Sequence, residues 1–405
     1  MLAKNRVIFT LIIAVLLLTT ATVVIFWARG FKPNFQKAKI ERTGLIVASS
    51  IPTGARVYLD NRLTSATDTN IAFLEPKTYH VRIEKDGYAK WEKDVEVKAD
   101  LATEIKALLF PTAPEIKPLT TTGSFNPTLS PDGSKIAYGV PGERGGLYVM
   151  PMSDRPFPFR ASPRLVVANQ LASFAGGTGF DFTDANFLWA PDSKQLVARF
   201  TTKEGQPLSN LLIDSDKDQQ EPRDITAALT ATLANWQEEI TAKAQTQAVL
   251  VPDSVKQATA AAKVESQKDL TLSTLPLLAS LAFGGTLNYY PTGLIFSPDE
   301  EKILYIDKQA RYKVYDLKNK KEFTLPDFAD LKTISWYPDS NHLVIAQKDL
   351  ISAIEADGNN KMTVYSGKFE NGFIFPHPSG TRLIILTALT QQEGTPANLY
   401  SINLK

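Results

Sequence analysis

Ser130-Pro131-Asp132-Gly133-Ser134-Lys135-Ile136-Ala137-Tyr138 is the stretch of this chain that decides the fold, because related segments recur four more times. The prolines of the other copies are Pro191, Pro298, Pro338 and Pro378. The last three prolines are 40 residues apart, which is a typical length for one four-stranded blade of a propeller. The repeat therefore predicts a β-propeller over residues 114–405.

Each copy has the chemistry of a tight turn between two strands. Pro131 presets φ near −65°, the Asp132 side chain can bond the backbone beyond it, and Gly133 can adopt a positive φ. Three other copies also carry the aspartate, as Asp192, Asp299 and Asp339. In place of the glycine these copies have Ser193, Glu300 and Ser340. We therefore expect type I or bulged turns there, without a left-handed residue. An aspartate repeated once per blade at a turn is interpreted as structural rather than catalytic.

Five copies are visible, and the 107-residue interval between Pro191 and Pro298 can hide a degenerate sixth, so the propeller is expected to have five or six blades. The interval contains an insertion over 224–285 that is predicted to be helical. Apolar residues recur there at helical spacing: Ile225, Leu229, Leu233, Trp236 and Ile240. Asp224 and Asp253 are predicted to cap two helices, the second extending to about Lys268. Packing of the insertion on its own propeller is favoured over a projecting partner-binding arm, because exposed apolar residues favour aggregation.

The repeat resembles that of TolB-type propellers, which reads S-P-D-G-x-x-I-A-Y followed by L-Y-V-M. Ser130 to Tyr138 and Leu147 to Met150 match this pattern closely. The resemblance covers most of 114–405 apart from the insertion. It implies binding of a protein or another ligand rather than catalysis.

Residues 44–110 predict a separate small β-sandwich. Short β-rich runs alternate with turns such as Pro52-Thr53-Gly54, and 79–84 alternates apolar and polar residues, which places His80 on the outer face. The segment resembles the PEGA domain in Leu45 to Ser49 before Pro52-x-Gly54-Ala55, in Val57 to Asp60, and in Asp86-Gly87-Tyr88 before Trp91. Its naming tetrapeptide is replaced by Glu75-Pro76-Lys77-Thr78, so Lys77 predicts an altered or strained turn. The resemblance implies an extracytoplasmic, non-enzymatic module.

A membrane-spanning helix is predicted at 7–27, between a short cytoplasmic tail at 1–6 and a basic stalk at 28–43. Val7 to Trp27 has no charged residue, Pro or Gly, and 21 helical residues span about 30 Å. A cleaved secretory signal is the alternative, but the apolar region of a typical signal is shorter than Val7 to Trp27 and ends in an A-x-A-like cleavage site, which this segment lacks. More Lys and Arg follow the span than precede it, which alone favours a cytoplasmic C-terminal side. Because long domains translocate despite nearby positive charge, we expect the N-terminus in the cytoplasm and the C-terminal domains outside.

Composition excludes most familiar chemistry. The chain has no Cys and only three His, so thiolate metal sites and cysteine nucleophiles are excluded. Its net charge of +1 does not favour binding to nucleic acid. We predict no cofactor. Asp214, Asp216 and Asp218 have the spacing of a calcium loop, but Gln219 and Ile225 stand where its glycine and bidentate glutamate belong, so they are only a weak metal candidate.

The sequence therefore predicts an all-β, single-pass membrane protein that acts without catalysis by binding a protein or glycan of the cell envelope. Two alternatives stay open. One is a polysaccharide-acting enzyme that uses two carboxylates with raised pKa values in the propeller funnel. The other is a purely structural spacer.

Overall fold

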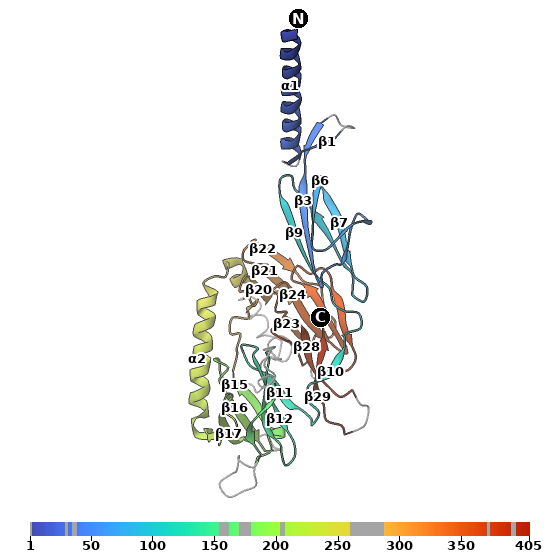
Figure 1. Cartoon of the computed structure of the whole chain (residues 1–405). Helices are drawn as coiled ribbons and strands as arrows, with labels where there is room; N and C mark the ends of the chain where they lie inside the picture. The colour runs from blue at the N-terminus through green and yellow to red at the C-terminus, as the bar shows by residue number, and fades with distance from the viewer. Residues whose placement is uncertain are drawn as a thin grey trace. The chain divides into compact units, whose positions relative to one another are not determined.

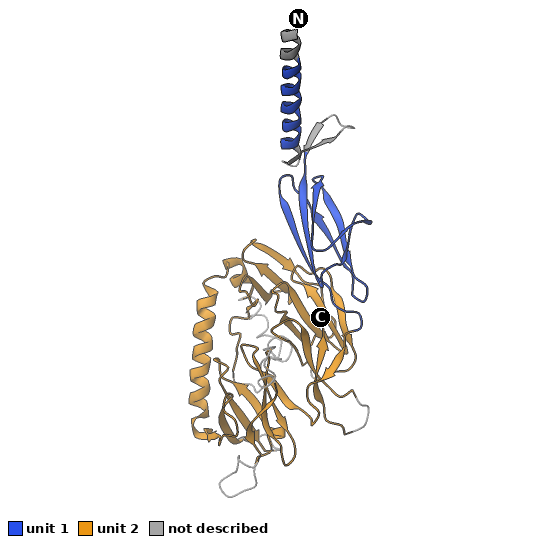
Figure 2. Ribbon diagram, in the orientation of Figure 1, with its two compact units in different colours: residues 1–113 blue, residues 114–405 orange. Residues whose placement is uncertain are grey.

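The computed structural model describes residues 2–28, 31–34, 39–153, 162–169, 180–202, 207–259, 287–370, 373–389 and 394–405. The chain divides into two compact units, Met1–Ala113 and Pro114–Lys405 (Figure 2). The division lies between the predicted sandwich and the predicted propeller.

The N-terminal helix α1 (Leu2–Ala28) contains an 18-residue stretch, Phe9–Phe26, with a mean hydropathy of 2.7. The hydroxyl groups of Thr19, Thr20 and Thr22 donate to carbonyls four residues earlier, at 2.7–2.9 Å, so these polar groups are satisfied without water. The helix has the length and composition of a membrane anchor or a signal sequence. The predicted stalk contains a short antiparallel pair, β1 (Phe31–Asn34) and β2 (Lys39–Arg42).

Two sheets form the predicted sandwich. The first has the order β6 (Thr69–Leu74), β3 (Gly44–Ile51), β9 (Ala102–Leu108), and the second has the order β5 (Arg62–Ala66), β4 (Arg56–Leu59), β7 (Thr78–Glu84), β8 (Trp91–Glu96). Strands β3 and β9 pair in parallel. Buried side chains of both sheets form one core, among them Ile46, Val57, Val81, Ile83 and Trp91.

The alternation in β7 agrees with its prediction. Tyr79, Val81 and Ile83 are buried, while His80 is exposed and its Nδ1 lies 2.9 Å from Asp94 Oδ1. Lys77 is not among the described residues with positive φ, so the altered tetrapeptide turns without a left-handed residue at that position.

Five four-stranded antiparallel sheets are described in the second unit, and we number them blades 1 to 5 along the chain (Figure 1). Blade 1 comprises β11 (Phe125–Leu129), β12 (Lys135–Val140), β13 (Gly146–Pro151) and β14 (Arg164–Ala168). Blade 2 comprises β15 (Asn186–Trp189), β16 (Gln195–Thr201), β17 (Pro207–Asp214) and β18 (Arg223–Asp224). Blade 3 comprises β19 (Ile295–Phe296), β20 (Lys302–Ile306), β21 (Tyr312–Asp316) and β22 (Lys321–Thr324). Blade 4 comprises β23 (Thr333–Trp336), β24 (His342–Gln347), β25 (Leu350–Glu355) and β26 (Met362–Ser366). Blade 5 comprises β27 (Ile374–Pro376), β28 (Arg382–Thr387), β29 (Asn398–Asn403) and β10 (Ile116–Pro118).

The first and last strands of this unit close the ring. Strand β10 is the fourth strand of blade 5, where Lys117 pairs with Ser401. Shared apolar cores join blade 1 to blade 2, blade 3 to blade 4, and blade 5 to blade 1. Blades 4 and 5 are joined through the Tyr337 hydroxyl, which donates to the Gly380 carbonyl. Closure of this kind holds the first and last blades together and leaves each sheet only short edges.

The five repeated turns, which we call the corners, join the first two strands of each blade. The residue two positions after each proline donates its amide to the carbonyl one position before that proline, at 2.8–3.0 Å. The prediction that the non-glycine copies avoid a left-handed residue is wrong, because Ser193, Glu300 and Ser340 have φ of 59°, 58° and 59°. Gly133 and Gly380 occupy the same position with φ of 71° and 63°. The hairpin geometry imposes this backbone whichever residue is present.

The insertion packs on the propeller between blades 2 and 3. Helix α2 (Leu229–Ala248) buries Leu233 and Ile240 against Leu188 and Val197 of blade 2. A second helix, described over 253–259, buries Val255 against Ile303 and Tyr305 of blade 3. Figure 1 shows α2 running along the side of the ring beside both blades.

Both predicted caps are wrong. Asp224 ends β18 and accepts the amide of Thr226, and Ala228 caps α2 without a side-chain bond. Asp253 is the first residue of its helix, whose initial bonds are accepted by the Pro252 carbonyl. The remainder of the predicted second helix, to Lys268, lies outside the described residues.

Candidate functional site

The repeated aspartates lie in the corners and stabilise them. Oδ1 of Asp132, of Asp192, of Asp299 and of Asp339 accepts the amide two residues further on, at 2.9–3.0 Å. Burial alone would raise the pKa of Asp132, Asp299 and Asp339, but the hydrogen bonds that these carboxylates accept hold each pKa below its usual value. A lowered pKa is the opposite of what a general acid needs.

Two pairs of neighbouring blades are joined at their corners by the same two hydrogen bonds. Between blades 1 and 2, Trp189 Nε1 donates to the Thr128 carbonyl at 3.2 Å, and Ser193 Oγ accepts the Asp132 amide at 3.2 Å. We call this pair of bonds the corner latch.

The same latch joins blades 3 and 4. Trp336 Nε1 donates to the Ile295 carbonyl at 3.0 Å, and Ser340 Oγ accepts the Asp299 amide at 3.1 Å. The serines that replace glycine in these corners thus contribute an inter-blade bond that glycine cannot make.

Blade 3 has different residues at the latch positions that would face blade 2. Phe296 stands where blades 2 and 4 have tryptophan, and Glu300 stands where they have serine. A phenyl ring has no N–H to donate. At this place a cavity of about 570 Å³ opens beside α2, and both residues line it together with residues of blades 1, 2 and 5.

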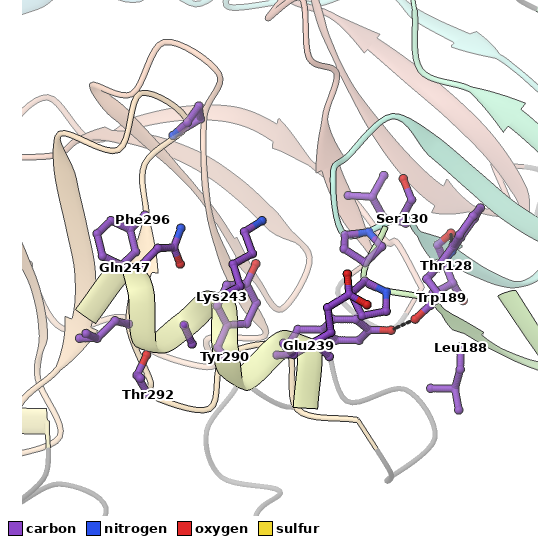
Figure 3. Close-up of a pocket in the computed structure, with 18 of the residues that line it drawn as sticks. Thr128, Ser130, Leu188, Trp189, Glu239, Lys243, Gln247, Tyr290, Thr292 and Phe296 are labelled. Atoms are coloured by element: carbon purple, nitrogen blue, oxygen red, sulfur yellow. Dashed lines mark hydrogen bonds between the residues drawn. The ribbon is translucent and has the colours of Figure 1, made fainter. Parts of the chain in front are cut away.

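The cavity combines aromatic and polar walls. Corner residues of three blades reach it: Ser130 and Pro131, Pro191, Ser297 and Pro298. The aromatic lining residues are Phe187, Trp189, Tyr289, Tyr290, Phe296 and Phe375. Helix α2 contributes Glu239, Lys243 and Gln247, which project from one side of the helix in Figure 3. A volume of this size is within the usual range for small-ligand sites.

Hydrogen bonds fix α2 and the aromatic wall in place. The Gln237 side chain exchanges two bonds with the backbone of Asn288, at 2.8 and 3.2 Å, and the Tyr289 hydroxyl donates to the Trp189 carbonyl. Gln247 Nε2 donates to Glu300 Oε1 at 3.2 Å. Tyr290 also lines the cavity; burial raises its pKa further above neutral pH, and a neutral phenol can both donate and accept a hydrogen bond. The arrangement suits a ligand with apolar faces and hydrogen-bonding edges.

The weak metal candidate lies elsewhere, at the end of β17. Each of its carboxylates has a cationic neighbour: Lys217 is 3.2 Å from Asp214, Lys135 is 2.9 Å from Asp216, and Arg164 is 3.1 Å from Asp218. Over the described ranges, no group of three or more His, Asp and Glu side chains has the geometry of a metal site. Asp216 and Asp218 thus join blade 2 to blade 1 through Lys135 and Arg164.

The sequence analysis did not identify the cavity residues. The available signal was the third repeat itself, whose Phe296 and Glu300 depart from the tryptophan and serine of the second and fourth repeats. Tyr289 and Tyr290, just before that repeat, were a second signal.

A family model described as PEGA domain matches residues 43–112, against the predicted 44–110. No curated protein sequence matched the chain. Many solved structures are similar, among them the following three. A TolB-type protein from Agrobacterium tumefaciens is 14% identical, with 70% of this chain and 74% of that chain covered and a TM-score of 0.22. TolB from Acinetobacter baumannii is 11% identical, with coverages of 87% and 64% and a TM-score of 0.24. An oligogalacturonate lyase in complex with manganese is 11% identical, with coverages of 81% and 86% and a TM-score of 0.30.

The chain thus combines an apolar N-terminal helix, a PEGA domain and a propeller with TolB-like repeats. The propeller is established by its own five four-stranded sheets.

Proposed function

We propose that this protein is a membrane-anchored, non-enzymatic binding protein of the cell envelope, and that its ligand site is the cavity that α2 and blades 1, 2, 3 and 5 line. The cavity is the observation that carries the proposal. It is open where the corner latch is replaced, and its partly exposed rings, Tyr290, Phe296 and Phe375, offer apolar area to a ligand.

The anchored topology has the N-terminus in the cytoplasm and both folded units outside. Support comes from the apolar helix α1 and from the PEGA domain, whose family implies an extracytoplasmic address. The chain has no native cysteine, so single cysteines report topology cleanly. We expect a membrane-impermeant maleimide to label Lys405→Cys but not Asn5→Cys in intact spheroplasts, and to label both after lysis. A shortened mature protein would instead indicate a cleaved signal.

Binding is tested with the tagged full chain in detergent, used to capture components of a solubilised envelope fraction. The comparison variant is Tyr290→Ala/Phe296→Ala, which removes two rings from the cavity. The matched control is Tyr58→Ala, a partly exposed tyrosine of the other unit. We expect a component that the wild type and the control retain and the cavity variant loses. Equal retention by all three proteins would contradict the cavity as the site, and no retained component would favour the structural spacer.

A further inference from the structure

We propose that the cavity binds an uncharged linear glycan of two or three pyranose units, extended along α2. This inference rests on the proposed function and names its ligand class. It depends on the spacing of the polar side chains of α2, on the aromatic wall opposite them, and on the balance of charge in the cavity.

The polar side of the cavity is a regular row. Glu239, Lys243 and Gln247 are four residues apart on α2 and all line the cavity. In an α-helix this spacing puts side chains on one face at intervals of about 6 Å, so the row is about 12 Å long. That length suits a chain of two or three linked pyranose rings, with one polar side chain for each unit.

The aromatic side of the cavity supplies the complementary surface. Tyr290 precedes β19, Phe296 ends it, and Phe375 lies in β27; all three rings are partly exposed and line the cavity. A pyranose ring has an apolar C–H face and a rim of hydroxyl groups. Its faces can pack on these rings while its rim bonds the α2 row and the Tyr290 hydroxyl.

The corners make an extended peptide a poorer occupant. Peptides that bind by strand addition need free backbone donors and acceptors along an edge. The edge strands β11, β15 and β19 reach the cavity, but the carbonyls of Thr128 and Trp189 already accept side-chain hydrogen bonds. The adjoining corners add Pro131, Pro191 and Pro298, which have no amide donor. Side chains therefore offer a ligand more hydrogen-bonding groups here than the strand edges do.

Charge favours a neutral ligand. Glu239 and Lys243 carry opposite charges, and Glu300 already accepts the Gln247 amide at 3.2 Å. Two carboxylates against one ammonium leave the lining net negative, so an acidic sugar is repelled. A basic sugar gains less than this charge suggests, because Lys243 repels it and Glu300 already accepts a bond. Hydroxyl groups of a neutral glycan can donate to Glu239 and accept from Lys243, which gives charge-assisted bonds of both kinds.

Isothermal titration of the full chain in detergent tests the ligand class with three trisaccharides: tri-N-acetylchitotriose, cellotriose and trigalacturonate. We expect at least one neutral trisaccharide to bind, with a Kd that is almost independent of salt, and the trianionic sugar to bind at least about tenfold more weakly. Preference for trigalacturonate, or no binding of either neutral sugar, would overturn the inference.

Variants then place the sugar in the cavity. Glu239→Gln is expected to raise the Kd about fivefold, and Tyr290→Ala about tenfold, because each removes one set of sugar contacts. Glu238→Gln is the matched control, since this exposed neighbour does not line the cavity, and its Kd should equal that of the wild type. Equal effects of the two glutamate variants would place the sugar elsewhere. If the cavity variant loses an envelope protein in the capture assay while no neutral trisaccharide binds, the ligand class is wrong and the proposed function stands.

Discussion

Ser193 offers the sharpest test of the corner geometry, because substitution by alanine and substitution by glycine are expected to change the stability of the propeller by different amounts. Its side chain accepts the Asp132 amide at 3.2 Å, and its backbone has φ of 59° although it is not glycine. Alanine removes the hydroxyl and keeps the left-handed strain. Glycine removes both.

The expected sizes follow from these two contributions. Loss of the hydrogen bond costs about 1 kcal/mol. Relief of the left-handed backbone returns about 1–2 kcal/mol, of which about 0.4–1 kcal/mol is lost again to the greater freedom of glycine in the unfolded chain. Ser193→Ala should therefore destabilise the propeller by about 1 kcal/mol, and Ser193→Gly should be close to neutral.

Glu300→Gly completes the comparison, because Glu300 has φ of 58° and its exposed carboxylate accepts a bond from Gln247. Relief of the backbone strain stabilises the propeller by about 1–2 kcal/mol, whereas the freedom of glycine in the unfolded chain costs about 0.4–1 kcal/mol and the lost bond costs about 0.5 kcal/mol. The variant should therefore be close to neutral and stabilise the propeller by at most about 1 kcal/mol. Thermal unfolding of the full chain measures all three variants, and 1 kcal/mol corresponds to about 2–4 °C in Tm for a unit of this size. Equal Tm values for Ser193→Ala and Ser193→Gly would refute the strain argument, and an unchanged Tm for Ser193→Ala would refute the latch.

Three further results are expected. Burial alone would raise the pKa of Asp339, but the hydrogen bonds from His342 and from two backbone amides lower that pKa. The ionised carboxylate therefore stabilises the folded propeller above its unfolded pKa of about 3.9, and this stabilisation is lost as the pH falls through the lower folded pKa. The urea midpoint of the propeller should fall as the pH drops below about 4, and less steeply in Asp339→Asn; parallel curves would argue against this role. Leu233→Ala should cost about 2–5 kcal/mol, because the buried leucine attaches α2 to blade 2; an unchanged urea midpoint would mean that α2 does not pack there. Trp91→Ala should cost the PEGA domain about 3–5 kcal/mol and leave the propeller transition in place, as separate calorimetric peaks would show. A shift of both peaks would contradict the division into two units.

The sequence predicted the elements that repeat or alternate. The proline-aspartate period located the blades, and the alternation at 79–84 identified the buried face of β7. Strand β5 was not predicted because it is an edge strand, and the solvent on both sides leaves no apolar alternation in Arg62–Ala66.

The errors arose where tertiary structure overrides local preference. Ser193 and Ser340 have a left-handed backbone because the corner hairpin requires it. The hydrogen bond that stabilises serine at this position comes from an amide of the neighbouring blade. The cavity depends on residues from four blades and α2, which are far apart in the sequence. Nothing in the sequence alone indicates that Glu239 and Phe375 line the same cavity.

Closure of the ring is the central claim, since the cavity exists only if the blades are held around one axis. The Leu119 amide donates to the Leu399 carbonyl at 2.8 Å, so Pro118 and Tyr400 lie opposite each other as a non-hydrogen-bonded pair, with Cα atoms about 4.5 Å apart. That separation suits a disulfide, and the native chain has no cysteine to compete.

Oxidation of Pro118→Cys/Tyr400→Cys is therefore the most direct measurement, followed by a non-reducing gel and peptide mapping. The closed ring predicts near-complete formation of one intramolecular disulfide between the two ends of the propeller, with none in the matched pair Pro118→Cys/Lys318→Cys, whose second site is exposed in blade 3. Absence of the first disulfide, or equal yields from both pairs, would contradict the ring.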